Sequence, residues 1–376
     1  MRVPKTLPRI HSKTPANSGV FLCTLLCCFF PLLLSSCDSK TNTPEWDQPG
    51  GSMPSRDHKD APTQPATAAA ATAEATPTDP TQADVATPAN PAPQQKPAPR
   101  HPEDGLRFMT YNVWNWLSMD RNWHDKVDNQ ESKPEEQKAA VIRLIIAHQP
   151  DILGLCEIGT AADLAEIQHR LKAGGLNLPH SHYTGGTDET RHLGILSRYP
   201  ITATAKPAET QFELEGKSFG INRGILDATI VANGKSYRFL GAHLKSKREI
   251  EDADQEQMRI REAHLLRRHA DSIFAKDPDV RLIAYGDFND YRNSEAVKTV
   301  LGAYRSPEYL TAIPFKDSRD QLWTHHWSYQ DVYSRIDFVT VSKTLRSEID
   351  KNASYIVDDD GWRDASDHRP IVAIFR

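Results

Sequence analysis

Acidic and amide side chains crowd together where one apolar run of the sequence ends. Residues 281–291 read "RLIAYGDFNDY", so Asp287, Asn289 and Asp290 follow the apolar stretch almost without a break. Carboxylates held this close repel one another unless a cation or a protonated partner offsets their charge. A cation site is therefore expected here if other segments deliver matching polar groups to the same place.

Five further polar residues occupy similar positions in other segments. Asn112 and Glu157 end apolar runs, and Asp337, Asp367 and His368 stand at the start of two later ones. Each residue alone has an ordinary explanation, because Asp and Asn at strand ends are commonly turn formers. Their recurrence favours a shared pocket at the ends of several strands.

Side chains two residues apart on a strand share a face. By this rule Asp287 and Asn289 are expected to point into one pocket, and His243 and Lys245 in "GAHLKSK" are expected to point together. The alternative for His243 is a strand histidine that is satisfied within the fold.

The segments between these residues alternate between strand-like and helix-like patterns. An amphipathic helix is expected within 134–150, a second helix within 160–175 and a charged helix near Ala253–Ala275. Asn233-Gly234 is expected to join two strands as a hairpin. Strands and helices in this order predict a layered α/β domain in which one sheet packs on another.

Six segments, in this order, resemble the endonuclease/exonuclease/phosphatase superfamily, which has the deoxyribonuclease I-like fold. They are "TYNVWN", "DILGLCEIG", "GAHL", "GDFND", "RIDFVTVS" and "SDHRPI", and the resemblance covers Leu106–Phe375. It implies a four-layer sandwich, with two packed mixed β-sheets flanked by helices. It also implies hydrolysis of a phosphoester with Mg²⁺ or Mn²⁺, which are hard cations that prefer oxygen ligands.

The resemblance implies a role for each acidic and amide residue. Glu157 would be the principal metal ligand, assisted by Asn112 and Asp367. Asp287 would orient or deprotonate the attacking water, because a water nucleophile needs a fixed base within hydrogen-bond reach. Asn289 would donate a hydrogen bond to a phosphoryl oxygen.

The resemblance also implies a set of cationic groups around the phosphate. His368 would be held by Asp337, and its imidazolium would stabilise the charge that develops on the phosphate. His243 would be a second phosphate-side histidine. Arg223 and Lys245 would contact the phosphate, although a surface ion pair explains either residue equally well. The acidic partner of His243 is left open between Asp188 and Glu189.

The adjacent histidines in "WTHHW", His325 and His326, raise the question of a zinc site. Adjacent residues on a strand point to opposite faces, and the sequence supplies no Cys or spaced His to complete a tetrahedral set. Zinc is therefore not predicted.

The N-terminal segment has the pattern of a bacterial lipoprotein. Basic residues precede an apolar run that ends in "LSSC", which resembles a lipobox, so residues 1–36 are expected to be a signal peptide and Cys37 the lipidated residue. A membrane-spanning helix is the alternative, but the run is short for one and contains Pro31. The expected location is the bacterial cell envelope, facing the periplasm or the exterior.

The rest of the chain divides into two parts. Residues 37–103 are rich in Pro, Ala and Thr and are expected to form a disordered tether. Residues 104–376 are expected to be the catalytic domain, and Cys156 is the one cysteine of that segment, so no disulfide can form within it. We interpret Cys156 as a small buried strand residue rather than as a nucleophile.

Charge restricts the substrate only weakly. From His101 onward the chain has 36 Lys and Arg residues against 42 Asp and Glu residues, which argues against a strongly basic face for nucleic acid. Lys245, Lys247, Arg248 and the segment 259–269 are the candidates for a basic contact surface. Five tryptophans could stack on bases or could be packing residues: Trp114, Trp116, Trp123, Trp323 and Trp327.

The combination of "GAHL", "GDFND" and "SDHRPI" favours the nuclease-like members, so we predict hydrolysis of DNA phosphodiesters. Small-molecule or lipid phosphoesters are the alternative substrates. A lipoprotein binding module without turnover is an alternative from a different class, and the complete catalytic set favours an enzyme over it. We expect no obligate protein partner and a monomer.

Overall fold

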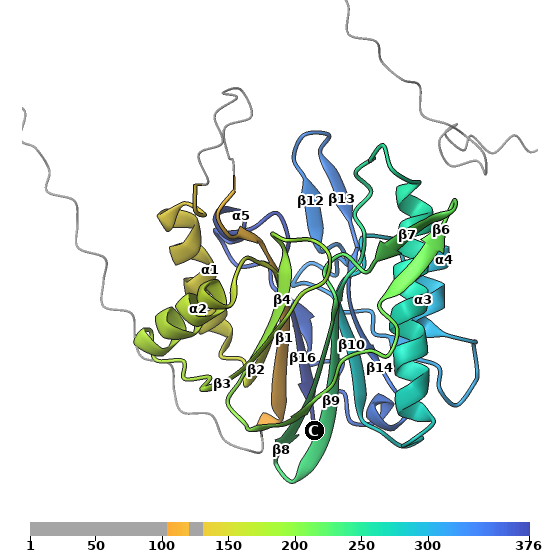
Figure 1. Ribbon diagram of the computed structural model, residues 1–376. Coiled ribbons are helices and arrows are strands. Elements are labelled where there is room, and N and C mark those ends of the chain that lie inside the picture. Colours follow the sequence, from red (N-terminus) through yellow and green to blue (C-terminus); the bar gives the residue numbers. More distant parts are fainter. Residues whose placement is uncertain (1–103, 120–130) are drawn as a thin grey trace, which may run out of the picture. The chain divides into compact units, whose positions relative to one another are not determined.

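The computed structural model describes residues 104–119 and 131–376 (Figure 1). The predicted signal peptide, Cys37, the predicted tether and Trp123 lie outside these residues. Within them, no helix combines the length and the apolar character that a membrane span requires.

Two six-stranded mixed sheets form the centre of the domain. In order across the first sheet, the strands are β15 (Tyr355–Ile356), β16 (Ile371–Phe375), β1 (Leu106–Trp116), β2 (Ile152–Ile158), β4 (His192–Ser197) and β3 (His180–Thr184). Across the second they are β11 (Thr311–Ala312), β14 (Asp337–Val341), β10 (Leu282–Asp287), β9 (Lys235–His243), β8 (Ile225–Ala232) and β5 (Ile201–Thr204). Asn233-Gly234 joins β8 to β9, which confirms the predicted hairpin.

Helices cover the outer face of each sheet (Figure 1). The helices are α1 (Glu135–His148), α2 (Ala161–Ala173) and α5 (Trp362–Ala365) on the first sheet, and α3 (Gln255–Phe274) and α4 (Glu295–Leu301) on the second. Ile145 of α1 packs in one buried cluster with Leu153 of β2, and Leu266 of α3 packs with Leu282 of β10. The predicted four-layer sandwich is confirmed.

Aromatic residues fill the space between the two sheets. The Phe108 ring lies 5.0 Å from the Phe239 ring and 4.8 Å from the Tyr285 ring, measured between centroids. Gly154 makes room for Tyr285, because a Cβ at this glycine would lie 2.2 Å from the tyrosine ring. Cys156 is buried in the same core, as the sequence predicts.

The strand directions bring the predicted site residues to one end of the sandwich. β1 runs parallel to β2, and β9 runs parallel to β10, so these four strands end together. β14 and β16 run antiparallel to their neighbours and therefore begin at the same end. Gly286 permits the close pairing there: its φ is 122°, and a Cβ would lie 2.1 Å from the carbonyl oxygen of Ala242.

A short 3-10 helix, η3 (Thr344–Arg346), and two short hairpins complete the described elements. One consists of β6 (Gln211–Leu214) and β7 (Lys217–Gly220), and the other of β12 (His325–Trp327) and β13 (Val332–Ser334). The β12–β13 hairpin stands at the same end of the domain as α5 (Figure 1). A single bridge between His325 and His368 connects it to the segment before β16.

Candidate active site

Asn112 connects the two carboxylates that end neighbouring strands of opposite sheets. Its Nδ2 donates to Glu157 Oε1 at 3.2 Å and to Asp287 Oδ2 at 3.1 Å. The second oxygen of Glu157 accepts from the backbone N–H of Asn115 at 2.9 Å. Glu157 has a left-handed φ of 63°, a conformation that costs roughly 1–3 kcal/mol for a residue other than glycine. Such strain is typical of residues held for a function.

His368 lies between two buried aspartates. Its Nδ1 is 2.8 Å from Asp337 Oδ2, and its Nε2 is 3.7 Å from Asp287 Oδ2. All three side chains are buried. The structure thus brings together the histidine and aspartate that the sequence analysis pairs, and it adds Asp287 to the same cluster.

The electrostatics of this cluster favour a protonated histidine. Burial alone would lower the pKa of His368, but the carboxylates of Asp337 and Asp287 outweigh it and raise that pKa well above its ordinary value. Burial and then the Asp337 charge raise the pKa of Asp287 to about 7. An imidazolium and a weakly acidic carboxyl group therefore face each other.

His325 lies in the site, although the sequence analysis does not place it there. Its ring centroid is 4.6 Å from that of His368, and its Nε2 is 3.9 Å from Asp367 Oδ2. His326 faces elsewhere, with Nε2 2.9 Å from Asp331 Oδ1, so adjacent histidines do point apart as expected. The position of His325 depends on a lone bridge to a distant segment, for which the sequence carries no periodic signal.

Among the described residues, Asp367 has no hydrogen bond to Glu157 or Asn112, the other two expected metal ligands. The Asp367 side chain is 32% exposed. Its partial burial, and then the negative charge of Glu157, raise the pKa of Asp367 above its ordinary value. Its carboxylate accepts from Ser366 Oγ at 3.4 Å.

His243 approaches the same carboxylates from β9. Its Nε2 is 3.7 Å from Asp287 Oδ2 and 3.9 Å from Glu157 Oε1, and the side chain is buried. Among the described residues, its Nδ1 has no hydrogen-bond partner. Asp188, one of the two acids considered for it, instead forms an ion pair with Arg223 at 3.2 Å.

Arg223 and Lys245 both lie close to this histidine but differ in their contacts. Burial and the charge of Arg223 lower the pKa of His243 well below its ordinary value. The Nη1 of Arg223 is buried and has no hydrogen-bond partner among the described residues. The Lys245 ammonium donates to the carbonyl oxygens of Ser246 and Arg248 at 3.3 and 3.0 Å. The strand rule does not extend to Lys245, because β9 ends at His243.

The same limit applies to Asn289. β10 ends at Asp287, and Asn289 has a left-handed φ of 52°, so strand alternation does not relate the two side chains. Asn289 is connected to the site through its backbone N–H, which donates to Asp287 Oδ1 at 2.8 Å. Its side-chain Nδ2 donates to the carbonyl oxygen of Leu244 at 2.9 Å.

The candidate basic surface is largely neutralised by ion pairs. Arg259 and Lys247 both pair with Asp290, at 3.0 and 3.3 Å, so this third polar residue of "DFND" faces α3 rather than the catalytic cluster. Arg268 pairs with Glu209 at 2.9 Å. Segment 259–269 therefore offers little unpaired positive charge.

Comparisons with known proteins agree with this arrangement. The model of the Endonuclease/Exonuclease/phosphatase family matches residues 109–368. Among solved structures, a beta toxin from Staphylococcus aureus is 16% identical with a TM-score of 0.51, and covers 72% of this chain and 100% of its own. The human Nocturnin catalytic domain, solved with a sulfate anion, is 18% identical with a TM-score of 0.51, and covers 73% of this chain and 94% of its own.

An endonuclease/exonuclease/phosphatase family protein from Leptotrichia buccalis is 17% identical, with a TM-score of 0.50, and covers 72% of this chain and 99% of its own. A search of curated protein sequences found no match. The structural neighbours share the fold, and the family match spans most of the chain. The chain therefore belongs to the endonuclease/exonuclease/phosphatase family of phosphoester hydrolases.

Proposed function

We propose that this protein is an Mg²⁺- or Mn²⁺-dependent phosphodiesterase that cleaves DNA outside the cytoplasm, held at a bacterial membrane by a lipid on Cys37. The proposed chemistry is supported by two groups of side chains that lie together at one end of the sandwich. One is the buried His368–Asp337 ion pair, and the other is the pair of carboxylates that share the Asn112 amide.

The donor set of the site fits a hard divalent cation. Glu157 and Asp287 approach one amide nitrogen of Asn112, so two carboxylates are held close together where their charges repel. Oxygen ligands of this kind suit Mg²⁺ or Mn²⁺, which retain several waters and need one or two carboxylates. Glu157, Asn112 and Asp367 would hold the ion, and the ion when bound would offset charge on the phosphoryl oxygens.

The buried side chains supply the remaining chemistry. Asp287 would take the proton of the attacking water, and the backbone N–H of Asn289 fixes the orientation of its carboxylate. His368, oriented by Asp337, would donate to the phosphate.

His243 Nε2 faces the Glu157 and Asp287 carboxylates from β9. Arg223 lies before β8, and its buried Nη1 has no hydrogen-bond partner among the described residues. His243 would donate from Nε2 to a non-bridging phosphate oxygen, and Arg223 would donate from Nη1. Lys245 and Asn289 would contribute more indirectly, because their side-chain donors bond to backbone carbonyls.

The test is a parallel assay of the purified full-length protein with Mg²⁺ on four substrates: plasmid DNA, RNA, sphingomyelin and bis-p-nitrophenyl phosphate. We expect nicking of the plasmid and slower cleavage of the small diester. Asp287→Asn is the control for contaminating nuclease, because it is expected to be inactive. If the plasmid stays supercoiled while a lipid or small ester is cleaved, the alternative substrate class replaces DNA. If none of the four is cleaved, a binding module replaces the enzyme.

A further inference from the structure

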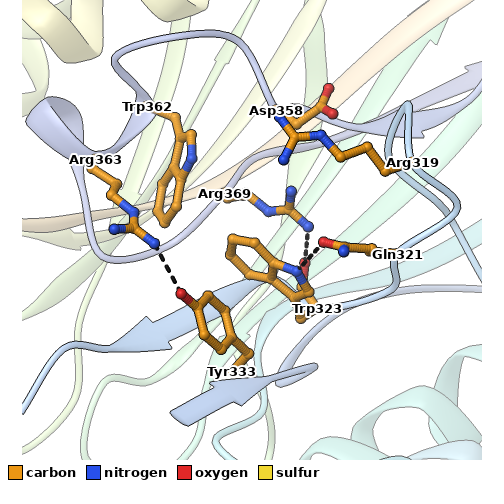
Figure 2. A pocket seen from close by; sticks show the side chains of 8 residues that line it. All are labelled: Arg319, Gln321, Trp323, Tyr333, Asp358, Trp362, Arg363 and Arg369. Carbon is orange, nitrogen blue, oxygen red and sulfur yellow. Dashed lines mark hydrogen bonds between the residues drawn. The ribbon is translucent and has the colours of Figure 1, made fainter. Parts of the chain in front are cut away.

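A cavity of about 600 Å³ lies beside the candidate active site and has no part in the chemistry above. Its volume falls within the range of roughly 300–1,000 Å³ that is typical of small-molecule sites. Figure 2 shows the residues that dominate its walls: Trp323, Tyr333, Trp362, Arg319, Arg363 and Arg369. Of the tryptophans considered as base-stacking platforms, Trp116 is buried core, whereas Trp323 lines this cavity.

The cavity and the catalytic cluster are neighbours along the chain and in space. His368 and Arg369 are consecutive residues, and the first joins the catalytic cluster while the second lines the cavity. The backbone N–H of Arg369 donates to the carbonyl oxygen of Thr324 at 2.6 Å. The hydroxyl of Thr324 in turn accepts from the backbone N–H of Asp337 at 3.1 Å. The segments of Thr324 and His368–Arg369 therefore connect the cavity to the catalytic cluster.

The floor of the cavity is a fixed aromatic platform. The guanidinium of Arg369 lies 3.4 Å from the centroid of the Trp323 ring, and its Nη1 donates to Asp317 Oδ2 at 2.8 Å. Arg369 is buried, so the cation–π contact and the ion pair are both protected from water. The Trp323 ring is thus held in place before any ligand binds.

Two further aromatic rings surround this platform. Trp362 lies 5.3 Å and Tyr333 lies 4.8 Å from Trp323, measured between ring centroids. Arg363 donates from Nη2 to the Tyr333 hydroxyl at 3.0 Å, which ties α5 to the β12–β13 hairpin across the cavity (Figure 2). Arg319 is exposed and has no ion pair with any residue that the structure describes. Flat rings and guanidinium groups are the surfaces on which unpaired bases stack.

The charge of the cavity restricts its ligand further. Three arginines line it against one acidic residue, Asp358, with Asp317 behind the wall. This balance disfavours a cationic headgroup such as phosphocholine, and an inositol phosphate has no flat ring to stack. A nucleotide combines a flat base with an anionic phosphate and matches both features.

We propose that this cavity binds one unpaired nucleotide of the substrate strand, next to the phosphodiester being cleaved. The proposal rests on the proposed nuclease function and makes it more specific. In a duplex, a base must leave its stack and its partner before it can enter the cavity, which costs a few kcal/mol. The protein therefore prefers single-stranded DNA over duplex DNA.

The test compares two matched double variants of the full-length protein. Tyr333→Ala with Arg363→Gln removes an aromatic–arginine pair of the cavity. Tyr304→Ala with Arg305→Gln removes an exposed pair outside it, in which the guanidinium lies 5.4 Å over the ring. kcat and KM are measured on a short single-stranded oligonucleotide, on its blunt duplex and on bis-p-nitrophenyl phosphate, which reports the catalytic centre alone.

We expect the unmodified protein to prefer the single strand over the duplex by at least about 10-fold in kcat/KM, given the usual strength of base–aromatic stacking. The cavity variant should lower the ratio of single-strand to small-diester kcat/KM by at least about 10-fold, mainly through KM. The control variant should retain the ratio. If the cavity variant also retains it, or if single strand and duplex are cleaved equally, the cavity is not a nucleotide site.

Two further measurements test the cavity if the cavity variant does not fold or if the protein does not cleave DNA. If the cavity variant does not fold, Arg319→Gln repeats the comparison at an exposed side chain. If the unmodified protein cleaves no DNA, the proposed function fails, and fluorescence anisotropy of a labelled single-stranded oligonucleotide then tests the cavity directly. Binding that the cavity variant weakens supports a nucleotide site, and the absence of binding overturns it.

Discussion

Replacing Asp287 with asparagine should separate stability from activity. Asp287 is the proposed general base, and its side chain is 2% exposed. Asparagine has nearly the same shape and keeps an oxygen that can accept from the Asn289 backbone N–H. It cannot accept a proton from water, however. We therefore expect the fold to survive while kcat falls by about 10²–10⁴-fold, the usual contribution of a general base.

The same substitution should stabilise the protein when divalent cations are removed. The pKa of Asp287 is raised from 3.8 to about 7 in the folded protein. The unfolded chain therefore loses this proton near pH 4, whereas the folded protein retains it to about pH 7, so stability falls as pH rises through that window. At about 1.4 kcal/mol per pKa unit, the penalty above pH 7 is on the order of 4 kcal/mol as an upper limit. Asparagine does not ionise and avoids this penalty. It loses the oxygen that accepts from Asn112 Nδ2, which costs about 1–3 kcal/mol, so the net gain is smaller than the penalty.

The assay is thermal unfolding in EDTA at several pH values, together with kcat on bis-p-nitrophenyl phosphate in Mg²⁺. At about 2–4 °C per kcal/mol for a domain of this size, the Asp287→Asn variant should melt several degrees above the unmodified protein at pH 8. The difference should disappear or reverse near pH 4. The carboxyl group is then protonated, so its burial no longer costs a charge, while the variant still lacks the oxygen that accepts from Asn112.

Asp227→Asn is a control that is expected to lower the stability of the protein rather than raise it. Burial alone would raise the pKa of Asp227, but hydrogen bonds from His269 and Arg238 outweigh burial and lower it. These contacts measure 2.7 Å to His269 Nε2 and 2.8 Å to Arg238 Nε. Asp227→Asn should therefore lose about 3–5 kcal/mol of stability at pH 8, where the buried ion pair is intact, and keep its kcat. A destabilised Asp287→Asn variant, or one with wild-type kcat, would refute the reasoning for the catalytic cluster.

Three further outcomes follow from the proposed function. Activity should vanish in EDTA and return with Mg²⁺ or Mn²⁺, and full activity in chelator would exclude a metal-dependent mechanism. Glu157→Gln should lower both the affinity for the ion and the rate. His368→Ala should lower kcat by at least about 10²-fold without unfolding the domain, and an unchanged rate would show that the phosphate binds elsewhere. Cys37→Ser should abolish lipid modification, and mass spectrometry that finds a mature protein beginning at Met1 would contradict the lipoprotein assignment.

The sequence predicts the layers of the fold and the end at which the polar residues meet. The apolar run that ends at Asp287 coincides with the end of β10, and Glu157 is the second-last residue of β2. The expected strand end at Asn112 is wrong, because β1 continues to Trp116, although its regular pairing with β2 is interrupted after Asn112. The order of strands and helices along the chain predicts the layers. Both signals come from short stretches of sequence, so they do not depend on contacts between distant segments.

The remaining features depend on contacts between segments that no periodic pattern connects. His325 reaches the site through one bridge to His368. Asp188 pairs with Arg223 rather than with a histidine, and both residues lie in irregular segments. Strand alternation also fails at Asn289, since it applies only while the strand continues. Irregular segments and the short strand β12, rather than the long strands of the two sheets, therefore account for what the sequence does not predict.

The division of the catalytic cluster between the two sheets has a consequence for the timing of biosynthesis. The first sheet contains the segments of Asn112 and Glu157, but it is completed only when β16, the last strand in chain order, pairs with β1, the first. His368 enters the cluster with that same last segment. A chain still being synthesised therefore contains Asn112, Glu157 and Asp287 but lacks both Asp367 and His368. If it is a nuclease, it cannot act on the nucleic acids of the cell that makes it until that final strand is in place.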